Sequence, residues 1–151
     1  MVEFETDEDI LRFAISREEQ AHQFYRILAG YAETASVRKI FEELAKEELG
    51  HKAKLELEIM KIGKVVTDSE RIEDLQQSDF IISGLDLDMN YKKDLLKLGI
   101  EKEDEAIMIY ADLASKVRRQ SFKEIFLALI QEEVKHKLRF ETEHENLLRE
   151  L

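Results

Sequence analysis

The feature that most constrains the fold is an internal repeat, because the sequence matches itself when it is shifted by 85 positions. The match needs no gap over residues 15–58 and 100–143. The identical pairs are Ile15/Ile100, Glu18/Glu103, Ala21/Ala106, Tyr25/Tyr110, Leu28/Leu113, Ala29/Ala114, Ser36/Ser121, Ile40/Ile125, Phe41/Phe126, Leu44/Leu129, Glu47/Glu132, Glu48/Glu133, His51/His136, Lys52/Lys137, Glu56/Glu141 and Glu58/Glu143. A unit that occurs only twice is typical of a pair of helical hairpins, whereas a solenoid needs three or more repeats.

The hydrophobic periodicity predicts four helices, at about residues 6–32, 36–63, 90–117 and 121–149. Thr6 is a good N-cap with acidic residues behind it, and Gly63 is a natural end for the second helix. Short links join the helices in pairs, so each pair is an antiparallel hairpin. The predicted fold is an all-α four-helix bundle of two hairpins, at about 6–63 and 90–149, in a single domain that covers 1–151.

Residues 64–89 are predicted to form a long crossover connection between the hairpins. Helices of this length span about 40 Å at a rise of about 1.5 Å per residue, and the connection is long enough to run the length of such a bundle. The second and third helices are therefore expected to be parallel. A short helix at about residues 69–78 is expected within the crossover.

The composition restricts the chemistry that the chain can carry. A net charge of −11 leaves no excess of Lys and Arg to contact the phosphates of nucleic acids. No apolar run approaches the roughly 20 residues of a membrane span, and the acidic N-terminus is unlike a signal peptide, so the protein is expected in the cytoplasm. The sequence has no cysteine, which removes disulfides and thiolate metal sites. Any metal must therefore be bound by carboxylates and imidazoles.

Each predicted helix has an apolar stripe at alternating spacings of three and four, which marks the buried face of a packed helix. The stripes are interrupted by polar residues at one matching level, namely Glu18, Glu48, His51, Glu103, Glu133 and His136. The Glu-x-x-His spacing is weak evidence by itself, because every histidine of this chain has a glutamate three positions earlier. The position of the six residues on buried stripes is what indicates a common site.

Four carboxylates that meet in a bundle core need compensation, since removing an ionised group from water costs several kcal/mol. Two divalent cations match four carboxylates in charge, and two neutral imidazoles complete the shell. Glu and His three positions apart on a helix point to one face, as in the di-iron and di-manganese sites of helical bundles. Such ligands suit iron or manganese, and zinc would bind too. The alternative is a buried network of Glu, His and Tyr without metal.

With these motifs the sequence resembles the ferritin-like superfamily and, within it, the rubrerythrin-type domains. The matching motifs are Glu18 and Tyr25 in REEQAHQFY, Glu48 and His51 in EELGHK, Glu103 and Tyr110 in EDEAIMIY, and Glu133 and His136 in EEVKHK. They cover nearly the whole chain apart from the crossover. The resemblance implies a ferritin-like bundle that binds two iron ions.

The resemblance also implies a role for each residue of the site. The ligands fall into three sets, which are the bridging pair Glu48 and Glu133, the pair Glu18 and His51 on one ion, and the pair Glu103 and His136 on the other. Tyr25 and Tyr110 would donate hydrogen bonds to the carboxylates and fix their orientation. The alternative for both tyrosines is aromatic filling of the core.

The sequence departs from the family pattern in two places. Rubrerythrins carry a rubredoxin domain, which this cysteine-free chain lacks, so electrons are expected from a separate partner such as a rubredoxin-like protein. They also carry an extra glutamate one turn after the terminal ligand of the third helix, where this chain has Ala106. Glu105 is nearby but turned away from the stripe, and only a π-bulge would rotate it toward the metals. His22 is expected to be a packing residue, because its repeat partner is Ile107.

The resemblance therefore implies a di-iron oxidoreductase of rubrerythrin type that reduces hydrogen peroxide or dioxygen and serves in oxidative stress. The alternative within the same fold is a protein that oxidises or buffers ferrous iron, in the manner of ferritin. A cytoplasmic homodimer is expected for this type, with no nucleic-acid or membrane partner. Lys52 and Lys137 are expected to be solvated charges beside the site.

Overall fold

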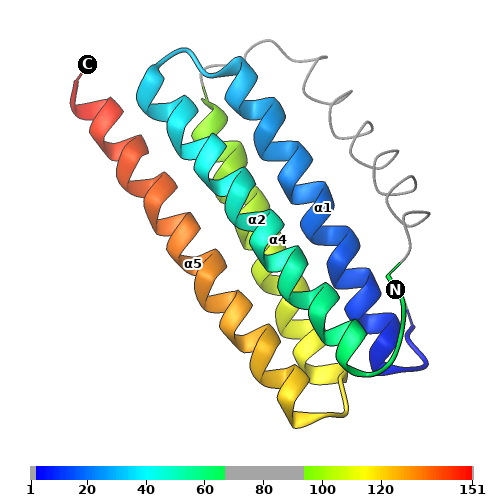
Figure 1. Ribbon diagram of the computed structural model, residues 1–151. Coiled ribbons are helices and arrows are strands. Elements are labelled where there is room, and N and C mark those ends of the chain that lie inside the picture. Colours follow the sequence, from blue (N-terminus) through cyan, green and yellow to red (C-terminus); the bar gives the residue numbers. More distant parts are fainter. Residues whose placement is uncertain (1–2, 67–93, 151) are drawn as a thin grey trace.

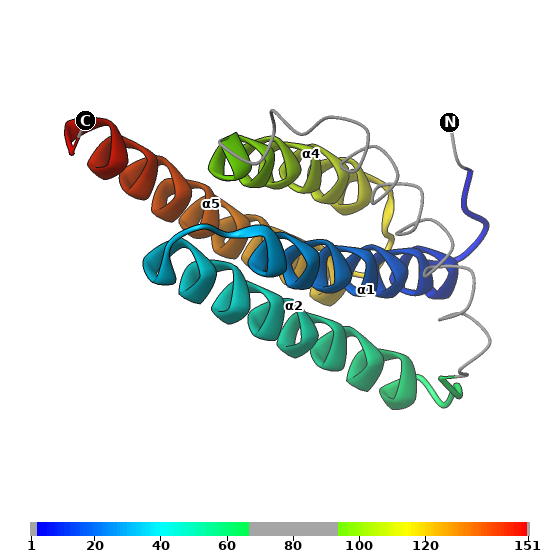
Figure 2. The same ribbon diagram turned by 90° about the horizontal axis from the view of Figure 1, so that it is seen from above.

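The computed structural model describes residues 3–66 and 94–150, and this part of the chain contains four helices and no strand. The helices are α1 (Asp7–Tyr31), α2 (Ala35–Lys61), α4 (Leu95–Lys116) and α5 (Gln120–Arg149). Two antiparallel hairpins, α1/α2 and α4/α5, lie side by side along a common direction, with α2 parallel to α4 (Figures 1 and 2). The prediction of an all-α, ferritin-like four-helix bundle is confirmed. Among the described residues, no helix is sufficiently long and apolar to span a membrane.

The predicted helix ends agree with the structure within one or two residues where they are described. The hydroxyl of Thr6 accepts a hydrogen bond from Asp9 N, and the carboxylate of Asp9 accepts one from Thr6 N, both at 3.2 Å. This capping box satisfies backbone groups that would otherwise lack a partner at the start of α1. Gly63 has φ = +80° just after α2, as expected of a glycine that ends a helix. The predicted start near Asn90, most of the predicted crossover and the short helix predicted within it lie outside the described residues.

A carboxylate from the first hairpin caps the last helix. Asp7 accepts hydrogen bonds from the backbone N–H groups of Arg118 and Arg119, at 2.9 and 3.0 Å. Arg119 is the N-cap of α5, and its own side chain makes no capping hydrogen bond. The negative charge of Asp7 also opposes the positive end of the helix dipole. Asp7 therefore joins the two hairpins at one end of the bundle.

A polar layer divides the hydrophobic core into two clusters. The first cluster includes Leu11, Leu55, Ile59, Leu113, Phe122 and Phe126. The second includes Phe24, Leu28, Phe41, Leu44, Leu96 and Phe140. Between them lie acidic and histidine side chains that are almost completely buried, namely Glu18, Glu48, Glu103, Glu133 and His136. The apolar clusters position this layer and shield it from water above and below.

Gly99 on α4 lies directly against the ring of Phe140 on α5. A Cβ atom at this position would lie 2.8 Å from Cε2 of Phe140. The Phe140 ring cannot move aside easily, because it is fully buried and packs against Tyr25 and Phe41. Gly99→Ala is therefore expected to lower the free energy of unfolding by about 1–3 kcal/mol, the usual cost of overpacking a core.

Urea unfolding of the metal-free protein would measure this effect, with Gly50→Ala as the matched control. A Cβ at Gly50, within α2, would meet no atom within 4 Å. The control is expected to gain about 0.5–1 kcal/mol, because alanine loses less backbone entropy than glycine in a helix. Equal effects of the two substitutions would contradict the packing explanation.

Candidate metal centre

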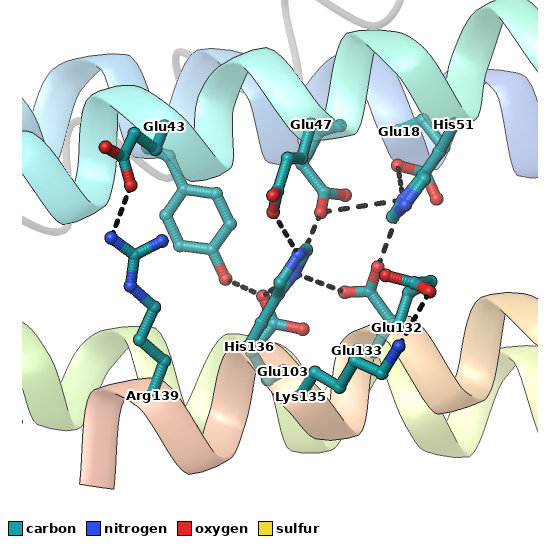
Figure 3. A network of polar contacts seen from close by, with 12 residues as sticks. Glu18, Glu43, Glu47, His51, Glu103, Glu132, Glu133, Lys135, His136 and Arg139 are labelled. Atoms are coloured by element: carbon teal, nitrogen blue, oxygen red, sulfur yellow. Dashed lines mark hydrogen bonds and ion pairs between the residues drawn. The ribbon is translucent and has the colours of Figure 1, made fainter. Parts of the chain in front are cut away.

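The six side chains predicted as ligands meet at the centre of the bundle, between the two apolar clusters (Figure 3). Ligand atoms within 4.8 Å of one another form two groups, one of Glu18, Glu48, His51 and Glu133 and one of Glu48, Glu103, Glu133 and His136. Glu48 and Glu133 belong to both groups, as a bridging role requires. Each remaining Glu/His pair belongs to one group, in the combination that the family resemblance implies. That these residues bind metal stays a prediction.

The six residues present unused ligand atoms to one another. Seven buried side-chain N or O atoms in the described part of the chain lack a hydrogen-bond partner, and one belongs to each of the six residues. A buried polar atom without a partner is unfavourable, and a cation at the centre of each group would satisfy these atoms together. Carboxylate oxygens and imidazole nitrogens are ligands that iron and manganese accept. The residues therefore fit a pair of such ions.

Both histidines turn the same ring nitrogen toward the carboxylates. Nδ1 of His51 lies 3.4 Å from Glu133 and 3.6 Å from Glu18. Nδ1 of His136 lies 3.3 Å from Glu48 and 3.4 Å from Glu103. In both residues Nδ1 is the atom available to a metal, which leaves Nε2 for another partner.

In the absence of a cation, the site holds protons. Burial and the nearby charges of Glu18 and Glu133 raise the pKa of Glu48 well above its usual range. Burial alone would lower the pKa of His51, but the nearby carboxylates of Glu133 and Glu18 raise it to about 10. The pKa of Glu133 is lowered, because contacts with Glu103, His136 and His51 outweigh the effect of burial. The protonated imidazoles thus supply positive charge, and the protonated carboxyl of Glu48 removes a negative one. Two metal ions would balance the charge of the carboxylates instead.

Each tyrosine of the repeat donates a hydrogen bond to a carboxylate of the other hairpin. Tyr25 on α1 donates to Glu103 on α4, and Tyr110 on α4 donates to Glu18 on α1. Burial and the neighbouring carboxylates raise the pKa of both hydroxyls well above the usual value, so they stay protonated. The predicted contact between these tyrosines and the carboxylates is present, and it links the two halves of the site.

Glu47 is a functional candidate that the sequence patterns did not identify. Its Oε2 lies 2.6 Å from Nε2 of His136. Because a carboxylate can only accept, Nε2–H donates this hydrogen bond and Nδ1 stays free for a metal. The repeat contains a usable signal, since Glu47/Glu132 is one of its identical pairs. Glu47 lies on the exposed side of α2, however, where stripe analysis finds no site residues.

Neither His22 nor Glu105 reaches the metal centre. Nδ1 of His22 donates to the backbone carbonyl of Ala45 at 2.7 Å, which agrees with the predicted packing role. Glu105 forms an ion pair with Arg17 at 2.5 Å and is half-exposed, and α4 is a regular helix at this position. Ala106 borders a small cavity beside Glu48. This alanine, at the position where an extra glutamate was considered above, therefore faces the site.

The prediction that Lys52 is a solvated charge is wrong. Its ammonium group lies 3.0 Å from the carboxylate of Glu19, and both side chains are buried. Lys137, its repeat partner, makes the corresponding ion pair with Asp104 at 2.7 Å, but remains partly exposed. Each hairpin therefore has one Lys–carboxylate pair beside the site. Only the pair in the first hairpin is shielded from water.

Comparison with known families gives one match. A family model described as Rubrerythrin matches residues 9–143, which include both hairpins and all six candidate ligands. No curated protein and no solved structure matches the chain.

Proposed function

Because the chain belongs to the rubrerythrin family of ferritin-like di-iron domains, we propose that it is an oxidoreductase that reduces hydrogen peroxide or dioxygen. The observation that carries this proposal is the set of six buried ligand atoms without hydrogen-bond partners, arranged as two overlapping groups. Two iron ions are the proposed cofactor, and manganese or zinc would fit the same ligands. Bound iron would supply electrons and Lewis acidity for cleavage of the O–O bond.

The protein contributes orientation, protons and protection from water. Reduction of hydrogen peroxide to two water molecules takes up two electrons and two protons. The hydroxyls of Tyr25 and Tyr110 hold protons at the edge of the site, next to Glu103 and Glu18. Both tyrosines also border a cavity of about 10 Å³, which is room for one water molecule. Such a space favours a substrate of very few atoms.

The proposed source of the electrons is a separate protein. The sequence contains no cysteine for an iron–sulfur or rubredoxin centre. A separate electron donor, such as a rubredoxin-like protein, is therefore part of the proposal. A cytoplasmic homodimer that acts in oxidative stress is the corresponding biological setting.

Oxidation of ferrous iron is a second candidate function, and one observation favours it. The position where rubrerythrins carry an extra glutamate is Ala106, and the nearby Glu105 is bound to Arg17 instead. A site with only the six ligands resembles one that oxidises iron and passes it on. Both functions use the same residues. They are distinguished by whether the protein consumes peroxide over many turnovers or oxidises and accumulates iron.

Metal analysis and two rate measurements test the proposal. Protein reconstituted with ferrous iron without oxygen is expected to bind about two ions per chain through the two ligand groups. With a chemical reductant present, it should consume many molecules of peroxide per chain while its iron content stays constant. Steady accumulation of ferric iron with little peroxide turnover would favour the second function. A chain that takes up no iron, manganese or zinc would overturn both.

Ala106→Glu is expected to increase peroxide turnover. The new carboxylate would lie one turn from Glu103 and next to the cavity that Glu48 and Glu133 border, so it would add a fifth carboxylate to the site. It is larger than the cavity and carries charge, so the metal-free variant should lose about 1–3 kcal/mol of stability.

Steady-state peroxide reduction at matched iron content would measure this gain. Ala21→Glu is the matched control, because Ala21 is the repeat partner of Ala106 and borders the same cavity from α1. An unchanged rate in Ala106→Glu, with both ions still bound, would show that the chemistry is not peroxide reduction.

A further inference from the structure

The two halves of the site are related by the repeat, and most of their contacts occur twice. The hydrogen bond from Tyr25 to Glu103 has a counterpart from Tyr110 to Glu18. The hydrogen bond between Glu47 and His136 should likewise have a counterpart between Glu132 and His51. In the described part of the chain, no ion pair or hydrogen bond joins Glu132 to His51. The two histidines are therefore supported differently.

One difference between the repeats concerns the surroundings of these two glutamates. Glu132 lies 3.3 Å from the ammonium group of Lys135 on its own helix (Figure 3). The repeat partner of Lys135 is Gly50, which has no side chain, so no cation competes for Glu47 in this way. Glu47 turns toward α5 and meets His136 across the helix interface, as Figure 3 shows.

A second contact fixes the position of Glu47 opposite His136. One turn away, Glu43 on α2 and Arg139 on α5 form an ion pair across the same interface. The repeat does not reproduce this pair, since position 128 is an alanine and position 54 a lysine. The interface between α2 and α5 is thus built to hold one histidine more firmly than the other.

A carboxylate on the outer nitrogen of a histidine changes its behaviour as a ligand. It fixes the tautomer and the orientation of the ring and makes the other nitrogen a stronger donor to a metal. Loss of such a partner typically lowers metal affinity about 10–100-fold. His136 has such a carboxylate partner in Glu47, whereas His51 has none among the described residues. The side chain of His51 is also more exposed, at 12% against 5% for that of His136.

We propose that the two metal positions are unequal and fill in order. The position formed with Glu103 and His136 binds its ion first and holds it. The position formed with Glu18 and His51 binds second and exchanges its ion with solution. This inference rests on the proposed two-metal site and adds which ion is resident and which is labile. Glu47 is the positioning residue that creates the difference.

Titration with Co²⁺ in the absence of oxygen tests the order, because bound cobalt is visible by its absorption and needs no turnover. The wild-type protein is expected to bind two ions in separate steps whose affinities differ about 10–100-fold. Glu47→Ala should weaken the first step by a similar factor and leave the second step unchanged. Glu47→Gln, which retains a hydrogen-bond acceptor without the charge, should restore part of the loss.

Two variants of the other half are matched controls. Glu132→Ala removes the repeat partner of Glu47, and both affinities should stay as in the wild type. Lys135→Ala releases Glu132 to turn toward His51, and the second step should then tighten toward the first. A variant that had merely lost helix stability would show neither a selective change in one step nor a gain in the other.

The results separate failure of this inference from failure of the proposed function. Absence of cobalt, iron and zinc binding by the wild type would remove the metal site itself. Binding of two Co²⁺ ions in a single step would leave the proposed function intact and overturn the order. Equal losses in Glu47→Ala and Glu132→Ala would overturn the role of Glu47.

Discussion

Glu48→Ala is expected to abolish binding of both metal ions, whereas Glu18→Ala should leave one ion bound. Glu48 belongs to both groups of ligand atoms, while Glu18 belongs to only one. A carboxylate shared by two cations neutralises part of each charge, and its loss leaves two cations to repel each other in a buried site. A terminal carboxylate serves one ion, and water can take its place.

The metal content of the two variants, reconstituted in parallel, measures the difference. Removing a buried carboxyl whose pKa is strongly raised also removes an unfavourable group from the metal-free bundle. The metal-free Glu48→Ala protein should therefore be at least as stable as the metal-free wild type, which separates loss of metal from loss of fold. Equal metal losses in Glu48→Ala and Glu18→Ala would contradict the bridging role.

The metal-free protein is expected to lose stability as the pH rises from 6.5 to 10, whereas the zinc-loaded protein should not. The pKa of His51 is about 10 in the folded chain against 6.5 for an ordinary histidine. Its contribution to stability is complete below pH 6.5 and disappears as the pH rises through 10. The raised pKa values of Glu48 and Glu103 act in the same direction, because unfolding lets these carboxyls ionise. Bound zinc replaces these protons, so the loaded protein has no such loss.

The expected loss of stability with rising pH is large enough to be measured by thermal unfolding. Each unit of raised pKa corresponds to about 1.4 kcal/mol, and about 1 kcal/mol shifts the melting temperature by about 2–4 °C in a chain of this size. A fall of roughly 10 °C across this pH range is therefore expected for the metal-free protein. His51→Gln should remove much of the slope. A slope of the same size in the zinc-loaded protein would show that it arises elsewhere.

The location of the candidate metal centre could be predicted from the sequence, because both the burial of a residue and its position on the helix follow from the apolar stripes. A glutamate that falls on an apolar stripe, such as Glu18 or Glu103, is buried wherever the stripe is buried. The repeat then places the two halves at one level, and the structure brings the ligand atoms together there. No knowledge of how the helices pair across the bundle was needed for this step.

The contacts that depend on pairing between helices could not be predicted in the same way. Glu47 lies on the exposed side of its helix, so only the relative shift of α2 and α5 brings it to His136. The burial of Lys52 depends in the same way on the approach of Glu19 from α1. The resemblance to rubrerythrin-type domains implied tyrosine–carboxylate contacts, but which tyrosine meets which glutamate follows from the antiparallel arrangement of α1 and α4.

The crossing of the tyrosine hydrogen bonds between hairpins has an evolutionary consequence. Each hairpin supplies one terminal glutamate, one shared glutamate, one histidine and one tyrosine, and its tyrosine binds the carboxylate of the other hairpin. One hairpin therefore holds half of a site and the partner group for the other half. Two copies of a single ancestral hairpin, related by a twofold axis, would have completed each other. The present chain has the form of such a dimer joined by gene duplication, and the difference between Gly50 and Lys135 records its later divergence.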